Sequence, residues 1–101
     1  RNAPYGSFDY PVGDAGVRLV FHMNEAGLSK RSPAWLRTQK ERLDDGRWVS
    51  RTDEQGTGVL TAVHFELDNS VTLVYQYPWQ EKPVYIPLDE DGNPKDEAEE
   101  E

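Results

Sequence analysis

Cysteine is absent from this 101-residue chain, which excludes disulfide bonds, thiolate metal ligands and thiol chemistry. Chains without cysteine are typical of reducing compartments, so we predict a cytoplasmic protein. No apolar run approaches the roughly 18 residues that a membrane-spanning helix needs. A Gly-x-Ser-x-Gly nucleophile motif is also missing, and Gly56-Thr57-Gly58 is too short for a loop that binds phosphate. We therefore expect a protein that is not an enzyme and that binds no cofactor.

Negative charge is in excess, with a formal net charge of −8 and a pI near 4.7. Most of this charge lies in residues 89–101, which hold eight acids and one base, whereas residues 1–88 hold eleven acids and ten bases. The acidic segment has no large apolar side chain, so ordering it would bury too little surface to offset the entropy cost. We predict a single α+β domain over residues 1–88, followed by a flexible acidic tail over residues 89–101.

Alternation of apolar and polar residues predicts several strands. In residues 17–24 apolar side chains occupy every second position, which is typical of a half-buried strand whose polar face includes His22. The pair Ser32-Pro33 is a helix-start signal, since serine caps free amide groups and proline loses nothing at the first helical position. We predict a helix over residues 33–43 that ends before Gly46. Shorter strands are predicted over residues 7–10, 47–52 and 84–86.

The clearest signal is a hairpin of two alternating strands, residues 59–67 and 71–77. A three-residue loop over 68–70 sets Leu67 opposite Val71, and only that register gives one continuous apolar face. Asn69 in this loop tolerates the left-handed conformation that such loops require. The resulting fold class is α+β: an antiparallel sheet of four to five strands with one short helix packed on a face.

The two histidines fall on the polar faces of predicted strands. His64 and Glu66 share a face two residues apart, which could begin a metal site or an acid–base pair. Two ligands do not make a metal site, and the spacing implies no third. The paired carboxylates Asp44 and Asp45 lie in a polar turn, whereas general acid–base catalysis needs carboxyls held in a water-poor cleft. We expect surface imidazoles beside a carboxylate, and no catalytic or metal-binding residues.

Basic residues gather in residues 30–51, where seven bases accompany three acids. With two tryptophans nearby, this surface offers an alternative function, a nucleic-acid-associated accessory domain. Acids are interleaved with these bases, and the acidic tail would compete with phosphate for them. The residues predicted for this alternative surface are Lys30, Arg31, Arg37, Lys40 and Arg42.

Aromatic residues gather in residues 75–85, where four occur in eleven positions and the chain is expected to leave the sheet at Pro78. Tyrosine and tryptophan anchor protein interfaces because they bury large areas with few rotatable bonds. We predict a protein-binding surface for a basic partner that acidic side chains would steer. An exposed strand such as 71–77 or 84–86 would also allow a homodimer. The predicted partner-binding residues are Tyr77, Trp79, Tyr85, Glu66 and Glu81.

A pattern in the C-terminal half resembles a known family. Gly46-Arg47-Trp48 is followed by a strand, an acidic turn and a second strand that ends in Tyr75-Gln76-Tyr77, and Lys82-Pro83-Val84-Tyr85 comes next. This order is similar to that of YezG-like immunity proteins, which bind and block the nuclease domains of bacterial toxins. The resemblance implies an immunity-type inhibitor of a bacterial toxin.

Overall fold

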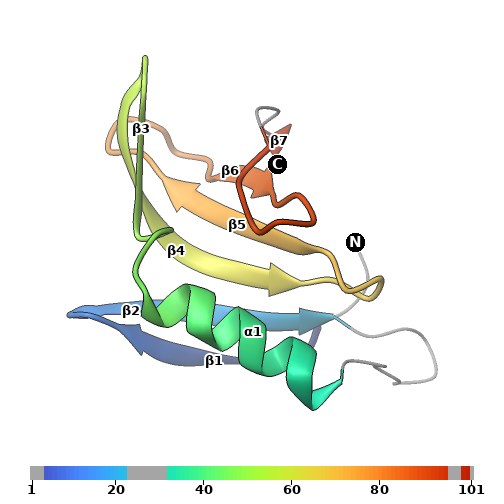
Figure 1. Cartoon of the computed structure of the whole chain (residues 1–101). Coiled ribbons are helices and arrows are strands. Elements are labelled where there is room, and N and C mark those ends of the chain that lie inside the picture. Colours follow the sequence, from blue (N-terminus) through green and yellow to red (C-terminus); the bar gives the residue numbers. More distant parts are fainter. Residues whose placement is uncertain (1–3, 23–31, 96–98, 101) are drawn as a thin grey trace.

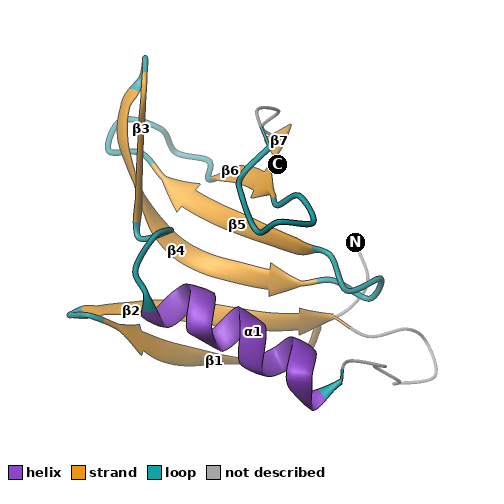
Figure 2. Ribbon diagram, in the orientation of Figure 1, coloured by secondary structure: helices purple, strands orange, loops and turns teal. Residues whose placement is uncertain are grey.

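The computed structural model describes residues 4–22, 32–95 and 99–100, which form a seven-stranded mixed sheet with one helix (Figures 1 and 2). The strands follow the order β1-β2-β4-β5-β6-β7, and β3 pairs with β4. Within the described part of the chain, no helix has the length and apolar character needed to cross a membrane. The elements are β1 (Pro4–Val12), β2 (Ala15–His22), α1 (Pro33–Asp44), β3 (Ser50–Asp53), β4 (Gly56–Phe65), β5 (Val71–Gln76), β6 (Val84–Pro87) and β7 (Glu99–Glu100).

The α+β class with one helix is confirmed, but the prediction of four to five strands, all antiparallel, is wrong. Strands β2 and β4 run parallel, with Arg18 opposite Ala62 and Phe21 opposite Phe65. Parallel neighbours need a long crossover connection, and here the connection contains α1. The helix returns the chain to the end of the sheet at which β2 began. Alternation of apolar and polar residues predicts which residues form strands, but it does not predict that the chain crosses back and that β4 pairs in parallel with β2.

The predicted helix is confirmed at both of its ends. The Ser32 hydroxyl accepts a hydrogen bond from the Trp35 amide at 3.0 Å, and proline occupies the first helical turn. Gly46 adopts a φ of 76°, the left-handed conformation that commonly ends helices. The buried side of α1 is narrow, since Gln39 and Leu43 are buried while Leu36 is 40 % exposed.

The core lies between α1 and one face of the sheet, which we call the helix face (Figure 2). A row of directly opposed residues crosses four strands on this face: Leu19, Val63, Leu73 and Ile86. Val63, Leu73 and Ile86 are completely buried. Trp35 of α1 packs edge-on against Phe65, with ring centroids 5.6 Å apart. The contact between Trp35 and Phe65 and the burial of Leu43 dock the helix on the sheet.

The β4–β5 hairpin is confirmed, but its predicted register is wrong by two residues. Phe65 lies opposite Val71, so the loop spans residues 66–70, and the Glu66 amide donates to the Ser70 carbonyl at 2.9 Å. A shift of two residues leaves the side chains from Ala62 to Phe65 on their predicted faces, because side chains alternate with a period of two. The apolar pattern therefore fixes these faces but cannot fix the loop length. An irregularity in the pairing between Leu60 and Ala62 then buries Leu60 and leaves Val59 51 % exposed. Asn69 takes a φ of 71°, as expected for an asparagine in such a loop.

The other predicted strands shift at their ends. Strand β1 extends the predicted 7–10 to nine residues, and β2 covers residues 15–22 where 17–24 was expected; residues 23–24 lie outside the described part of the chain. Strand β3 begins only at Ser50, so Trp48 precedes it. Trp48 is buried. Its carbonyl accepts a hydrogen bond from Tyr75 of β5, and its ring donates one to Gly92 in the segment that follows β6.

Residues 88–95 contact the domain rather than extending from it. The Trp48 indole Nε1 donates to the Gly92 carbonyl at 3.2 Å, and the Lys95 amide donates to the Pro87 carbonyl at 2.9 Å. Leu88 is buried and forms a bridge with Pro94. Strand β7 pairs with β6 in antiparallel fashion. For residues 96–98 and 101, the prediction of a flexible tail lies outside the described residues.

Candidate functional site

The β5–β6 loop, residues 77–83, carries the most exposed large apolar side chain of the described residues. Trp79 is 61 % exposed, and the next such residue, Val59, is 51 % exposed. The loop lies beside the β3–β4 hairpin, which projects from the rest of the sheet (Figure 1). An exposed indole is one of the side chains that are enriched among the anchors of protein interfaces.

Hydrogen bonds hold this loop against the hairpin turn. The Gln80 side-chain amide donates to Gln55 Oε1 at 2.6 Å, which joins the loop to the β3–β4 turn. The Gln76 side-chain amide donates to the carbonyls of Tyr77 and Gln80, which closes the loop from within. Trp79 therefore lies on a loop that is hydrogen-bonded both to the β3–β4 turn and within itself. A side chain held in this way loses less conformational entropy on binding than one on a free loop.

Two glycines of β4 make room for the aromatic rings. The Trp79 ring lies so close to Gly56 that a β-carbon there would overlap it, and a β-carbon at Gly58 would lie 2.8 Å from the Tyr77 ring. Gly56 also adopts a φ of 117°, which glycine tolerates best. Glycine within a strand often marks such a close approach. The Gly-x-Gly spacing, which sequence reasoning weighed only as a phosphate loop, was the available signal.

Tyr77 lies in the interior, so the expectation that it stands outward is wrong. Its side chain is 1 % exposed and packs in the core. The Tyr77 hydroxyl donates to Asp53 Oδ2 at 2.6 Å and accepts from Arg51 Nη1 at 3.2 Å. The hydrogen bond from Tyr77, the Gln55 amide and the Arg51 charge lower the pKa of Asp53. Burial and the bond to Asp53 raise the pKa of Tyr77.

The other predicted partner-binding residues occupy two different places. Glu81 is exposed on the same loop as Trp79. Tyr85 lies opposite Val74 on β5, on the sheet face that points away from the core row, so it does not join Trp79. Glu66 is half-buried near the end of β4, beside the histidines. The structure therefore brings Trp79 and Glu81 to one site, and Tyr85 and Glu66 to another.

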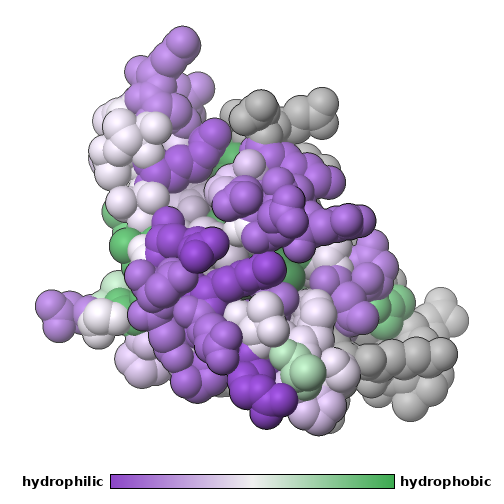
Figure 3. Space-filling view, viewed as in Figure 1, coloured by the Kyte–Doolittle hydropathy of each residue, from purple (hydrophilic) through white to green (hydrophobic). Residues whose placement is uncertain are grey.

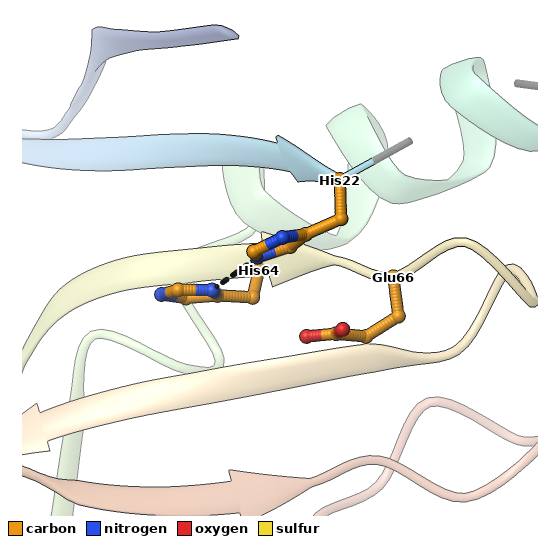
Figure 4. A group of neighbouring side chains, drawn as sticks. All are labelled: His22, His64 and Glu66. Atoms are coloured by element: carbon orange, nitrogen blue, oxygen red, sulfur yellow. Dashed lines mark hydrogen bonds between the residues drawn. The ribbon is translucent and has the colours of Figure 1, made fainter. Parts of the chain in front are cut away.

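The second place is a cluster of His22, His64 and Glu66 on what we call the imidazole face, the sheet face opposite the helix face (Figure 4). His22 Nε2 and His64 Nδ1 are 2.8 Å apart and share a hydrogen bond. The two rings stack, with centroids 5.0 Å apart and planes inclined by 20°. One ligand atom from each of the three residues lies within 4.8 Å of those of the other two.

Sequence reasoning missed the third member of this cluster. It expected His22 at the surface, and the residue is 2 % exposed. The parallel pairing of β2 with β4 places Val20 opposite His64, and His22 follows two residues later on the same face. The spacing of His64 and Glu66 gave two of the three members. No local signal could give the third, His22, because its position depends on the crossover through α1.

Of the predicted basic surface, Lys40 is in a local ion pair and Arg42 packs against the segment that follows β6. Lys40 Nζ contacts Asp44 Oδ2 at 2.7 Å, and the hydrogen bonds from Lys40 and Tyr10 lower the pKa of Asp44. Arg42 lies against Gly92, and its guanidinium donates to Gln39 at 3.4 Å. Arg37 is exposed, whereas Lys30 and Arg31 lie outside the described residues.

The face that carries α1 is mostly hydrophilic (Figure 3). A cleft of about 610 Å³ opens between α1, the β4–β5 loop and residues 88–95. Bases and acids both line it, so the cleft does not favour a ligand of one charge sign. The charged lining residues are Arg42, Asp68, Asp89, Glu90 and Lys95.

No protein-family model, no curated protein and no solved structure matches this chain.

Proposed function

We propose that this chain is a non-enzymatic protein-binding module that acts in the cytoplasm on a basic protein partner. The observation that carries the proposal is the exposure of Trp79 on a loop that hydrogen bonds tie to the β3–β4 hairpin. A large indole that is both exposed and fixed contributes buried area to a complex at low entropy cost. Exposed Glu81 and Glu54 flank this site, and the net charge of −8 favours a positively charged partner.

Within that class we favour an immunity-type inhibitor of a bacterial toxin, with a toxin nuclease as the leading partner. This finer assignment rests on the resemblance of the β4–β5 hairpin and of the residues that follow it to YezG-like immunity proteins. Nucleases are basic where they bind nucleic acid, so the charge of this chain agrees with such a partner.

The nucleic-acid alternative has less support from the arrangement of the bases. Lys40 and Arg47 pair with Asp44 and Asp45 at 2.7 and 2.9 Å. A phosphate would have to displace these carboxylates before it could bind. Crosslinks to nucleic acid in the experiment described next would support this alternative function.

Site-specific crosslinking tests the partner-binding surface. A photoreactive phenylalanine derivative replaces Glu81, which is exposed on the same loop and leaves Trp79 in place, and in a control it replaces Leu36, a partly exposed apolar residue on α1. We expect a basic protein from extracts of the source cells to crosslink at position 81 and not at position 36. Identical products at both positions, or crosslinks to nucleic acid, would count against the proposal.

The captured protein is then purified and titrated with substituted chains. Trp79→Ala should weaken binding by at least tenfold, which corresponds to about 1.4 kcal/mol, whereas Leu36→Ala should change it by less than twofold. For the inhibitor assignment, cells that express the captured protein should grow only when this chain is co-expressed. A Trp79→Ala affinity equal to that of the wild type would remove the main support for the site.

Electrostatic steering by the terminal acids is tested with a chain that ends at residue 95. This end point keeps the contact between Trp48 and Gly92 and removes five acids. The association rate should fall, and its dependence on salt should weaken, while the dissociation rate changes little. Unchanged association kinetics would assign the steering to the rest of the chain.

A further inference from the structure

The histidine cluster has the donor chemistry of a metal site. A neutral imidazole has one nitrogen that donates and one that accepts, so the bond between His22 Nε2 and His64 Nδ1 places a single proton between two ring nitrogens. A metal ion can take the same position when that proton moves to the other nitrogen of its own ring, which leaves both facing nitrogens free to coordinate. We propose that His22, His64 and Glu66 form a binding site for a divalent transition-metal ion, with Zn²⁺ as the favoured ion.

The distances are close to those that a metal requires. Two nitrogens each bound at about 2.0–2.1 Å to a tetrahedral ion lie about 3.3–3.4 Å apart. The observed separation is 2.8 Å, so binding asks the rings to part by about half an ångström. The candidate ligand atoms, one from each residue, already lie within 4.8 Å of one another. Small rotations of these side chains would bring all three to one ion.

The scaffold holds the two histidine ligands on paired strands. His64 is in β4 and His22 is in β2, and the two strands are paired in parallel. Glu66 follows β4 directly and extends its side chain toward the two rings (Figure 4). Tyr85 packs edge-on against His64, with centroids 5.6 Å apart. Ligands fixed by strands and by packing lose less freedom on binding an ion than ligands on loops.

The donor set selects the class of ion. Two imidazoles and one carboxylate suit Zn²⁺ and its neighbours Co²⁺ and Ni²⁺, whereas Ca²⁺ and Mg²⁺ prefer all-oxygen sites. Three protein ligands leave a fourth tetrahedral position for a water molecule or another donor. This site lies on the imidazole face, away from Trp79, so it does not depend on the proposed function.

Binding is tested with the metal alone, Zn²⁺ by calorimetry and Co²⁺ by visible absorption. We expect one ion per chain and a Co²⁺ spectrum with imidazole ligation. The chain has only two histidines, so that signature can come only from His22 and His64. Removing one ligand by His64→Gln or Glu66→Gln should weaken binding at least about tenfold, the lower end of what even outer-shell changes cost. Glu81→Gln, an exposed acid on the β5–β6 loop, is the matched control and should leave binding unchanged.

A measurement on the unsubstituted protein guards against variants that fail to fold. Nitrogen-15 resonances of both imidazoles should shift together as Zn²⁺ is added, and they should saturate at one equivalent. The proposal is overturned if the ring resonances stay in place, or if Glu81→Gln weakens binding as much as Glu66→Gln does. The first result would show no imidazole coordination, and the second would assign the binding to surface carboxylates.

Discussion

The two faces of the sheet bury different kinds of side chain. On the helix face, the buried row of Leu19, Val63, Leu73 and Ile86 is entirely apolar and belongs to the hydrophobic core. On the imidazole face, His22 and Thr72 are buried together with Val74, and none of the three belongs to the core cluster. Both faces therefore exclude water from part of their area, but only one does so with a continuous apolar core.

The contrast teaches that burial and apolar character are separate properties of a strand. A polar side chain can be buried at low cost when a partner satisfies it, as the hydrogen bond between His22 and His64 does. Apolar burial on the helix face supplies most of the stability. The imidazole face can hold a specific set of polar groups because the other face already stabilises the fold.

The largest expected effect compares valines on the two faces. Val63→Ala leaves a cavity in the hydrophobic core and should lower the free energy of unfolding by about 2–3 kcal/mol. Val74→Ala removes the same atoms from the imidazole face, where the surroundings are not a continuous core, and should cost about half as much. Urea denaturation of both variants measures the difference. Equal losses at the two positions would show that the faces are equivalent in packing.

A smaller loss of stability is expected when the buried hydroxyl of Tyr75 is removed. Tyr75→Phe removes the hydrogen bond to the Trp48 carbonyl, which is 2.8 Å long, and should cost about 1–2 kcal/mol because it leaves that carbonyl unsatisfied. Tyr10→Phe, which removes an exposed bond to Asp44, is the control and should cost less. If both variants unfold at the same urea concentration, burial does not strengthen the Tyr75 bond.

The same substitution should change stability at alkaline pH. Burial raises the pKa of Tyr75 from 10.0 to about 12. A raised pKa stabilises the folded state below pH 10, and this contribution is lost as the pH rises through about 12. The wild type should therefore lose stability between those values more steeply than Tyr75→Phe does, as measured by urea midpoints.

The smallest change in stability is expected for Tyr77, whose hydroxyl donates to Asp53 of the β3–β4 hairpin. Tyr77→Phe removes the hydroxyl that helps to lower the pKa of Asp53 from its ordinary value of 3.8. A lowered pKa stabilises the folded state above that value, and the contribution is lost as the pH falls through the folded pKa. The variant should be less stable than the wild type at pH 7 and should converge with it in acid. A gap that persists in acid would assign the loss to packing.

Much of the fold could be predicted from the sequence, because its signals are local. The Ser32-Pro33 start of α1 and the left-handed Asn69 follow from the chemistry of single residues. The hairpin register could not be predicted, because a shift of two residues keeps the faces of residues 62–65 and only the loop geometry distinguishes the two pairings. The exposure of Trp79 was predicted from the density of aromatic residues and the position of Pro78, but the burial of Tyr77 was not.

The sequence by itself determined which segments are helical or extended, and which side chains alternate toward a core. The tertiary structure alone decided that β4 lies beside β2 and runs parallel to it, which brings His22 to His64 across 42 positions of the chain. The physical reason is that alternation acts between neighbours in the sequence. The choice between strand partners depends on how the whole apolar surface, including that of α1, is most completely buried.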